Sequence, residues 1–342
     1  MHAVPRALTA LLVALAIALP SHATTAPALT PREHRRGVEQ TFLTFPEWFL
    51  VFSPAEYAEL VRNKTPDEFV FWGHIGQFWR SYAAIAREID RRGYPPNPGY
   101  HLMIMVIGVS TTVEYAIRSA YETLIGRVTS AVAGELTEED RYGARVAQEY
   151  VDFIRVRPWY EFDFAARLKG LWTRVPASGA HPLRKWERRY ALTTEYLVKA
   201  AYGKLIERAT RSVYEVPKEV TAVVVEGAPC PGARVEAAGD VDASHTLVLL
   251  PRYEAFTPAS QALARCNLRF IEIAGNRTDI LVSTVGSRSA APVADATLLF
   301  ALPILTRPAE ERRAYVVPVS RLTEFFRAAE GQGLVVEHVF DY

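Results

Sequence analysis

Residues 216–225 read VPKEVTAVVV, and this stretch divides the chain into two parts of different character. On its C-terminal side, short runs rich in β-branched residues alternate with Gly, Pro and Asp, which is the pattern of strands and turns. On its N-terminal side, apolar residues recur at three- and four-residue steps, the spacing of one helical face. The sequence therefore predicts an α+β protein, with a helical domain over residues 24–216 and an α+β domain over 217–342.

Two similar units lie in the C-terminal part. Each is a strand, a helix and a strand, at 246–250, 258–266 and 268–274 in the first unit and at 315–319, 321–330 and 334–340 in the second. Such a unit makes its two strands parallel through a crossover. Two units in one sheet predict a ferredoxin-like (split βαβ) domain, with 279–285 and 297–305 as additional strands.

Helix-start signals recur in the N-terminal part. Thr30, Ser53 and Thr65 are each followed by proline and then by glutamate at the third position, a combination that satisfies the first N–H groups of a helix. Thr137 with Asp140 is a weaker version of the same signal. We expect helices to begin at these four points. Helical periodicity covers residues 66–93, 100–126, 138–156, 159–172 and 182–214.

The first 23 residues have the three parts of a secretory signal peptide. A basic start at 1–6 is followed by an apolar run at 7–19 and by the small-residue end Ser21-His22-Ala23. The apolar run is shorter than the roughly 20 residues that a helix needs to cross a bilayer. We expect cleavage after Ala23, with an uncleaved anchor as the alternative, and a periplasmic or inner-membrane-associated protein.

Export affects the interpretation of Cys230 and Cys266, because disulfides persist in an oxidising compartment. We expect the two cysteines to be bridged, which would stabilise the fold by roughly 3 to 4 kcal/mol in the chain-entropy model. Two buried free thiols are the alternative. No CxxC motif accompanies them, so a thiol redox centre is not expected.

Composition and motifs narrow the class of function. Lys and Arg number 39 against 38 Asp and Glu, so the chain lacks the strong positive charge of a field-driven nucleic-acid binder. It also lacks the phosphate loop GxxxxGK[ST], the hydrolase elbow GxSxG and the zinc motif HExxH. We therefore expect no nucleic acid, cofactor or metal and favour a non-catalytic role. An enzyme remains an alternative because convergent active sites need no shared motif.

The helix expected over 100–126 carries the most unusual polar pattern. Glu114, Arg118 and Glu122 follow at steps of four and stack on one helical face. The plain interpretation is a salt-bridge row at the edge of the helical domain. The functional alternative is an active-site or small-ligand pocket around Glu114 and Arg118, closed by Trp79 and Tyr115. The candidate ligand-binding residues are Glu114, Arg118, Glu122, His74, Trp79 and Tyr115.

Three other stretches have a structural and a functional interpretation. His74 and His101 are first interpreted as hydrogen-bonded structural residues. The aromatic block at 41–52 predicts a helix-turn-helix corner packed inward, with Glu47 near a helix start, or else an interfacial membrane anchor. The aromatic and basic stretch 159–174 suits a helix that covers a neighbouring core or lies on an anionic membrane.

A basic cluster follows this stretch. It consists of Arg184, Lys185, Arg188 and Arg189, interleaved with Trp186 and Tyr190. We expect a solvated helix face, with phospholipid head groups as the next candidate partner. Residues 100–117 could also be a spanning or re-entrant segment, but Glu114 and the short apolar length argue against this.

The block TFLTFPEWFLVF (41–52), together with Gln77-Phe78-Trp79, VIGVS (106–110) and IGR (125–127), resembles an uncharacterised bacterial family of exported or membrane-associated proteins. The resemblance implies a bacterial envelope location and brings no known activity. Our leading hypothesis is a non-catalytic envelope protein, in which the helical domain associates with a membrane or a protein partner and the α+β domain mediates association.

Overall fold

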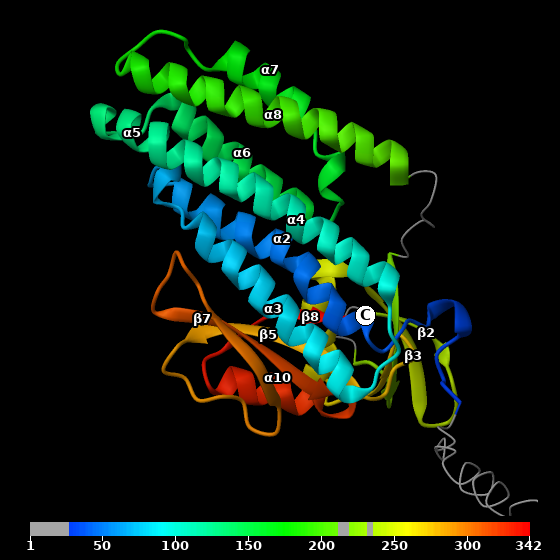
Figure 1. Cartoon of the computed structure of the whole chain (residues 1–342). Coiled ribbons are helices and arrows are strands. Elements are labelled where there is room, and N and C mark those ends of the chain that lie inside the picture. Colours follow the sequence, from blue (N-terminus) through cyan, green and yellow to red (C-terminus); the bar gives the residue numbers. More distant parts are fainter. Residues whose placement is uncertain (1–26, 211–218, 231–234) are drawn as a thin grey trace, which may run out of the picture.

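The computed structural model describes residues 27–210, 219–230 and 235–342. The helices of the N-terminal part form an elongated bundle that stands on the α+β part (Figure 1). The predicted signal peptide and the predicted boundary at 216–217 lie outside the described residues. The helical elements are η1 (Arg32–His34), α2 (Gln40–Val61), η2 (Pro66–Glu68), α3 (Phe71–Arg92), α4 (Pro98–Tyr121), the π-helix η3 (Glu122–Gly126), α5 (Arg127–Ala133), α6 (Glu138–Ile154), η4 (Trp159–Glu161), α7 (Phe164–Arg174) and α8 (Pro182–Thr210).

The weakest of the predicted helix starts is the one that the structure confirms. Thr137 and Asp140 form a reciprocal capping box at the start of α6. Thr30 instead donates its hydroxyl to Glu272 and precedes a single 3₁₀ turn. The signal at Thr65 likewise precedes a 3₁₀ turn, and α3 begins at Phe71. The signal at Ser53 lies inside α2.

The predicted helix-turn-helix corner at 41–52 is also wrong, because α2 runs through it and places Glu47 in mid-helix. A proline inside a helix costs about 3 kcal/mol, and α2 contains Pro46 and Pro54. The cost is offset because Phe42, Phe45 and Phe49 are almost fully buried, at about 1.5–3 kcal/mol for each such side chain. The expectation that this block packs inward is confirmed.

The C-terminal part contains two antiparallel four-stranded sheets, with strand orders β2-β3-β1-β4 and β6-β7-β5-β8. The α+β class is therefore confirmed, but the expectation of one sheet is wrong, and a ferredoxin-like fold is not confirmed. The elements are β1 (Val220–Glu226), β2 (Glu236–Asp240), β3 (His245–Pro251), η6 (Tyr253–Ala255), α9 (Phe256–Arg265), β4 (Arg269–Ile273), β5 (Asp279–Ser287), β6 (Thr297–Pro303), β7 (Glu310–Pro318), η7 (Val319–Arg321), α10 (Leu322–Gly331) and β8 (Val335–Phe340).

Each predicted strand-helix-strand unit is present, but its two strands are not neighbours, because a third strand lies between them in the sheet. β3 and β4 both pair with β1 and are antiparallel to it, so they are parallel to each other without touching. β7 and β8 flank β5 in the same way. Each unit is thus a split β-α-β arrangement whose central strand comes first in the chain.

The two units repeat one another beyond their topology. In the first unit, the pairing of β1 with β4 shifts register between Val224 and Val225. In the second unit, the pairing of β5 with β8 shifts register between Ser283 and Thr284. These positions coincide when β1 and β5 are aligned by their pairing with β3 and β7. Each helix also reaches the opposite unit: Val339 N–H donates to the hydroxyl of Thr257 on α9, and Thr323 on α10 donates to the carbonyl of Leu268. The two units therefore share one topology and one register shift, and the helix of each unit contacts the other unit.

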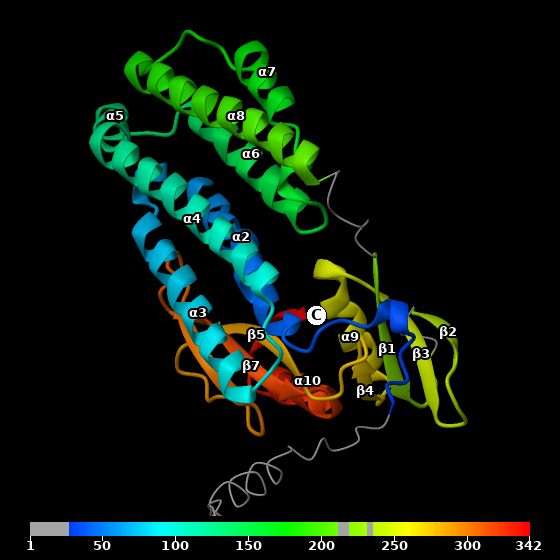
Figure 2. The same cartoon turned by 45° about the vertical axis from the view of Figure 1, so that its right-hand side comes forward.

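Of the four hydrophobic clusters in the described residues, two involve the α+β part. The first lies between the two units and includes Phe256 of α9, Phe270 of β4 and Tyr315 of β7. The second joins the bundle to the outer face of the second sheet, where Phe45 of α2 meets Phe340 of β8. Figure 2 shows α3 beside β5 and β7. Because this second core contains residues from both predicted domains, the bundle and the second sheet are one packed unit.

The predicted disulfide is present. Cys230 and Cys266 are bridged, with their Cα atoms 5.7 Å apart. The bridge ties the segment after β1 to the end of α9, both in the first unit.

Candidate functional site

The helix pair α4–α5 carries an exposed apolar face along most of its length. Its members recur at three- and four-residue steps, so they share one side of the helix. We call them the apolar face: Leu102, Val106, Val109, Val113, Ile117, Leu124 and Val128. Leu102, Ile117 and Leu124 are each about two-thirds exposed or more, at 66%, 65% and 73%. The exposed positions between 102 and 126 are uncharged, although the side chain of Glu114, at a partly buried position, is 41% exposed where it pairs with Lys199.

Helix α8 has the same character. Between residues 182 and 203 its exposed positions are uncharged, and its large exposed apolar side chains are Leu183, Trp186, Tyr190, Leu197, Val198 and Tyr202. A helix on the surface of a soluble protein normally turns its apolar side to the core and its charges to water. In α4 and α8 this arrangement is reversed.

The charged residues of α4 and α8 face each other across the space between the two helices. Arg118 of α4 lies 3.5 Å from Glu195 of α8, and Lys199 of α8 lies 3.1 Å from Glu114 of α4. Further along, Tyr121 donates a 2.8 Å hydrogen bond to Glu187. Position along α4 rises as position along α8 falls, so these contacts hold the helices antiparallel.

A second group of ion pairs lies deeper, between α8, α6 and the π-helix. Arg184 donates to Asp140 at 2.8 Å, Arg189 donates to Glu139 at 2.7 Å, and Arg188 donates to Glu122 at 2.9 Å. The expectation that this basic cluster is a solvated face is wrong: Arg184, Lys185, Arg188 and Arg189 are all buried. Acidic partners from α6 and from the π-helix compensate the buried positive charges, and Trp186 and Tyr190 occupy the exposed side instead.

Electrostatic balance decides the protonation of these groups. Burial by itself would raise the pKa of Glu195, but Arg118 and Lys199 lower it to about 2. Burial also opposes the charge of Arg118, yet Glu195, Tyr57 and Glu114 raise its pKa well above the usual value. Burial raises the pKa of Glu122 despite the attraction of Arg188. Glu195 and Arg118 are therefore both ionised, and each compensates the charge of the other.

Five of the six candidate ligand-binding residues are gathered around packed aromatic side chains. Tyr115 and Trp79 belong to one hydrophobic cluster with Phe69 and Phe71, and His74 stacks on Phe69. Arg118 lies over the rings of Tyr57 and Phe71, 4.5 and 5.4 Å from their centroids, and is 3.6 Å from Glu114. Glu122 is separate and pairs with Arg188.

The polar atoms of this group are partly satisfied by one another. Tyr115 shares a 2.8 Å hydrogen bond with Ser53, and Trp79 donates to Thr112 at 3.0 Å. His101 is hydrogen-bonded to Tyr82, as expected for a structural histidine. The same expectation is wrong for His74: both ring nitrogens are buried without a hydrogen-bond partner, and Glu56 lies 3.7 Å away.

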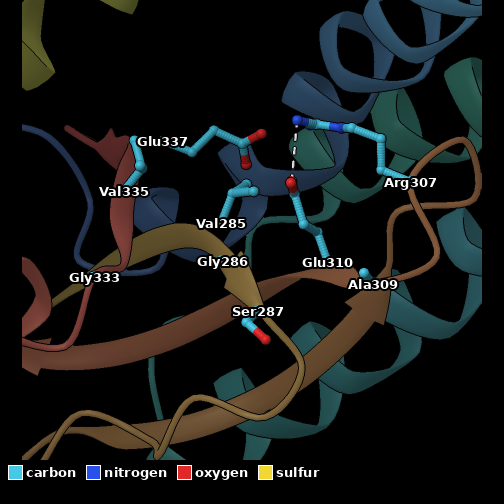
Figure 3. A pocket seen from close by; sticks show the side chains of 9 residues that line it. All are labelled: Val285, Gly286, Ser287, Arg307, Ala309, Glu310, Gly333, Val335 and Glu337. Carbon is cyan, nitrogen blue, oxygen red and sulfur yellow. Dashed lines mark ion pairs between the residues drawn. The ribbon is translucent and has the colours of Figure 1, made fainter.

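A concavity of about 650 Å³ opens at one end of the second sheet (Figure 3). Arg307, Glu310 and Glu337 are its charged lining residues. Arg307 pairs with Glu310 at 3.0 Å, and Glu337 accepts two hydrogen bonds from Arg312. A second concavity of about 350 Å³ lies between α3 and β6. None of the six candidate residues lines either of them.

Each charged residue that lines the first concavity has an ion-pair partner: Arg307 pairs with Glu310, and Glu337 pairs with Arg312. Within the described ranges, no three His, Cys, Asp or Glu side chains are grouped as a metal ion would require. By length and composition, one described helix, Pro98–Ala133, could cross a membrane, and 17% of its apolar window is buried.

Comparison with known proteins identified no relative of this chain. No protein-family model matches the chain, and neither a curated protein nor a solved structure matches it significantly.

The reversed amphipathicity was missed by the sequence interpretation. A signal was present: Leu183, Trp186, Tyr190 and Leu197 recur at helical steps on one side of α8, whereas Arg184 and Arg188 share another. Which of the two sides faces water depends on the acidic residues of α6, and those are distant in sequence.

Proposed function

We propose that this protein is a non-catalytic component of the bacterial cell envelope, exported by its N-terminal segment and attached to a membrane through its helical bundle. The observation that carries the proposal is the apolar face of α4–α5, which is long and exposed and meets an exposed charge only at its end, where Arg127 lies beside Val128.

The size of the apolar face supports the proposal that it binds a hydrophobic partner. Scattered exposed apolar residues are normal on soluble proteins, but a contiguous apolar patch marks an interaction surface. Burying a Val, Leu or Ile side chain is worth about 1.5–3 kcal/mol. Seven such residues, each about half to three-quarters exposed, would together contribute on the order of 5–10 kcal/mol, enough for stable attachment.

The disulfide supports the proposed export, because such bonds persist in oxidising compartments. The α+β part would mediate association with other envelope components. Its surface strands β2 and β6 lie at sheet edges, where backbone groups are open to a further strand.

Fractionation of cells tests the proposal. We expect the processed protein in the membrane fraction, resistant to high salt and released by detergent, because the attachment is apolar rather than ionic. Complete release into the soluble periplasm without detergent would refute membrane attachment. Recovery of the unprocessed chain from the cytosol would refute export.

A further inference from the structure

Resting on the proposed membrane attachment, we infer that α4–α5 does not cross the bilayer but lies in the plane of one leaflet, with its apolar face among the acyl chains. The partner of this surface is thus the hydrocarbon of a single leaflet. The inference follows from what occupies the other sides of the bundle.

The inner side of α4 is packed along its length by other helices. Near its middle, Gly108 approaches so closely that a Cβ atom there would clash with the ring of Phe78 on α3. Near its end, the ring of Tyr115 contacts Phe71 of α3, and its hydroxyl bonds to Ser53 of α2. A crossing α4 would therefore take α2 and α3 into the hydrocarbon with it.

The outer sides of the neighbouring helices are strongly charged. On α3 the exposed charged residues are Arg80, Arg87, Asp90 and Arg91. On α6, which packs against α2, they are Glu138, Arg141, Arg145, Glu149 and Asp152. Each charge at the centre of a bilayer costs more than one apolar side chain gains there. A crossing orientation is therefore unfavourable.

An in-plane orientation avoids this cost. Only the apolar face enters the lipid, while α3 and α6 keep their charges in water. The face extends from Leu102 to Val128, about 39 Å at 1.5 Å per residue, which is longer than the roughly 30 Å hydrocarbon core of a bilayer. This length is no constraint for a helix that lies along the surface, as amphipathic membrane helices do.

Depth measurements distinguish the two orientations. Leu102→Cys, Val113→Cys and Val128→Cys variants of the exported chain would each carry a fluorophore and be bound to phosphatidylcholine vesicles that contain lipids brominated at shallow or deep acyl positions. An in-plane helix predicts similar quenching at all three sites, strongest with shallow bromines. Quenching that is deepest at Val113 and weaker at both ends would show a crossing helix and overturn the inference.

A matched pair of charge insertions tests the surface itself. Ile117→Lys adds a charge to the apolar face, and Ala83→Lys adds the same charge to an exposed position of α3. In flotation with phosphatidylcholine vesicles, we expect at least a tenfold weaker partition for Ile117→Lys and less than a twofold change for Ala83→Lys. Circular dichroism checks that both variants are folded.

The outcomes separate the inference from the proposed function. If the unmodified protein does not float with vesicles, membrane attachment itself fails. If it floats but Ile117→Lys floats equally well, another surface binds lipid and the inference is overturned. A dimer in solution whose formation is abolished by Ile117→Lys would show that a second copy covers the face, and this also overturns the inference.

Discussion

Glu139 of α6 and Arg189 of α8 form a 2.7 Å ion pair in which both side chains are almost completely withdrawn from water, with 0% and 2% exposure. The other oxygen of Glu139 accepts from Lys185 at 3.0 Å. One carboxylate therefore forms ion pairs with two buried cations. Removing one partner of a buried pair leaves an uncompensated charge and typically costs about 3–5 kcal/mol. We expect Glu139→Gln to lower the free energy of unfolding by about this amount, measured by urea denaturation.

The adjacent residue supplies the control. Glu138 also approaches Lys185, at 3.8 Å, but its side chain is 56% exposed. Exposed ion pairs are worth up to about 1 kcal/mol, so Glu138→Gln should change the stability by less than this. Equal losses for the two variants would contradict a special role for the buried carboxylate.

We expect the protein to lose stability in mild acid, because it contains two buried histidines. Burial lowers the pKa of both His74 and His338 to about 3, from 6.5 in an unfolded chain. The unfolded state therefore takes up protons first as the pH falls. The stability that the two neutral rings contribute is present above pH 6.5 and is lost between pH 6.5 and 3. The slope approaches about 2.7 kcal/mol per pH unit for two groups.

A histidine variant isolates this effect from other titrations. The ring of His338 lies against Trp48, with centroids 3.6 Å apart and the planes tilted by 34°, and neither of its ring nitrogens has a hydrogen-bond partner. His338→Leu should reduce the slope of unfolding free energy between pH 6 and 4 by about 1.4 kcal/mol per pH unit. An unchanged slope would show that His338 does not titrate as described.

Reduction of the disulfide should weaken the first unit of the α+β part. The bridge between Cys230 and Cys266 closes a loop that contains β2 and β3. Opening such a loop costs roughly 3–4 kcal/mol in the chain-entropy model. We expect a reducing agent to lower the unfolding free energy of the native protein by this amount. The double variant Cys230→Ser, Cys266→Ser should have the lower stability already and be insensitive to the reductant.

The sequence predicted those features that are determined by interactions between residues close together in the chain. Helix α3 follows from the spacing of its own apolar residues, and it ends at Gly93 in the left-handed conformation, as its sequence indicates. Most strands were located for the same reason, but β2 was not predicted and β7 begins at Glu310, five residues before its predicted start. The order of the strands was not predicted, because the placement of β1 between β3 and β4 is decided by pairing between distant segments.

The candidate site shows the same contrast between local features, which were predicted, and contacts between distant segments, which were not. The step-of-four spacing of Glu114, Arg118 and Glu122 did predict residues on one helical face. Whether Arg118 serves a ligand or an ion pair depends on Glu195, which lies on a helix far along the chain. Similarly, the basic cluster on α8 looked solvated because its partners Glu139 and Asp140 belong to α6.

The contact between α3 and α4 provides a prediction about packing. Gly108 lies where a Cβ atom would be 2.4 Å from Phe78 and 2.9 Å from Trp79. Gly108→Ala must push these rings apart, and overpacking of this kind costs about 1–3 kcal/mol. Gly76, inside α3, is the control, because a Cβ atom there would meet nothing closer than Arg80 at 4.0 Å. Gly76→Ala should raise the thermal midpoint, since alanine is favoured over glycine in helices by up to about 1 kcal/mol. Opposite shifts for the two variants are therefore expected, and a shift of the same sign and size would show that α4 does not pack on α3 this closely.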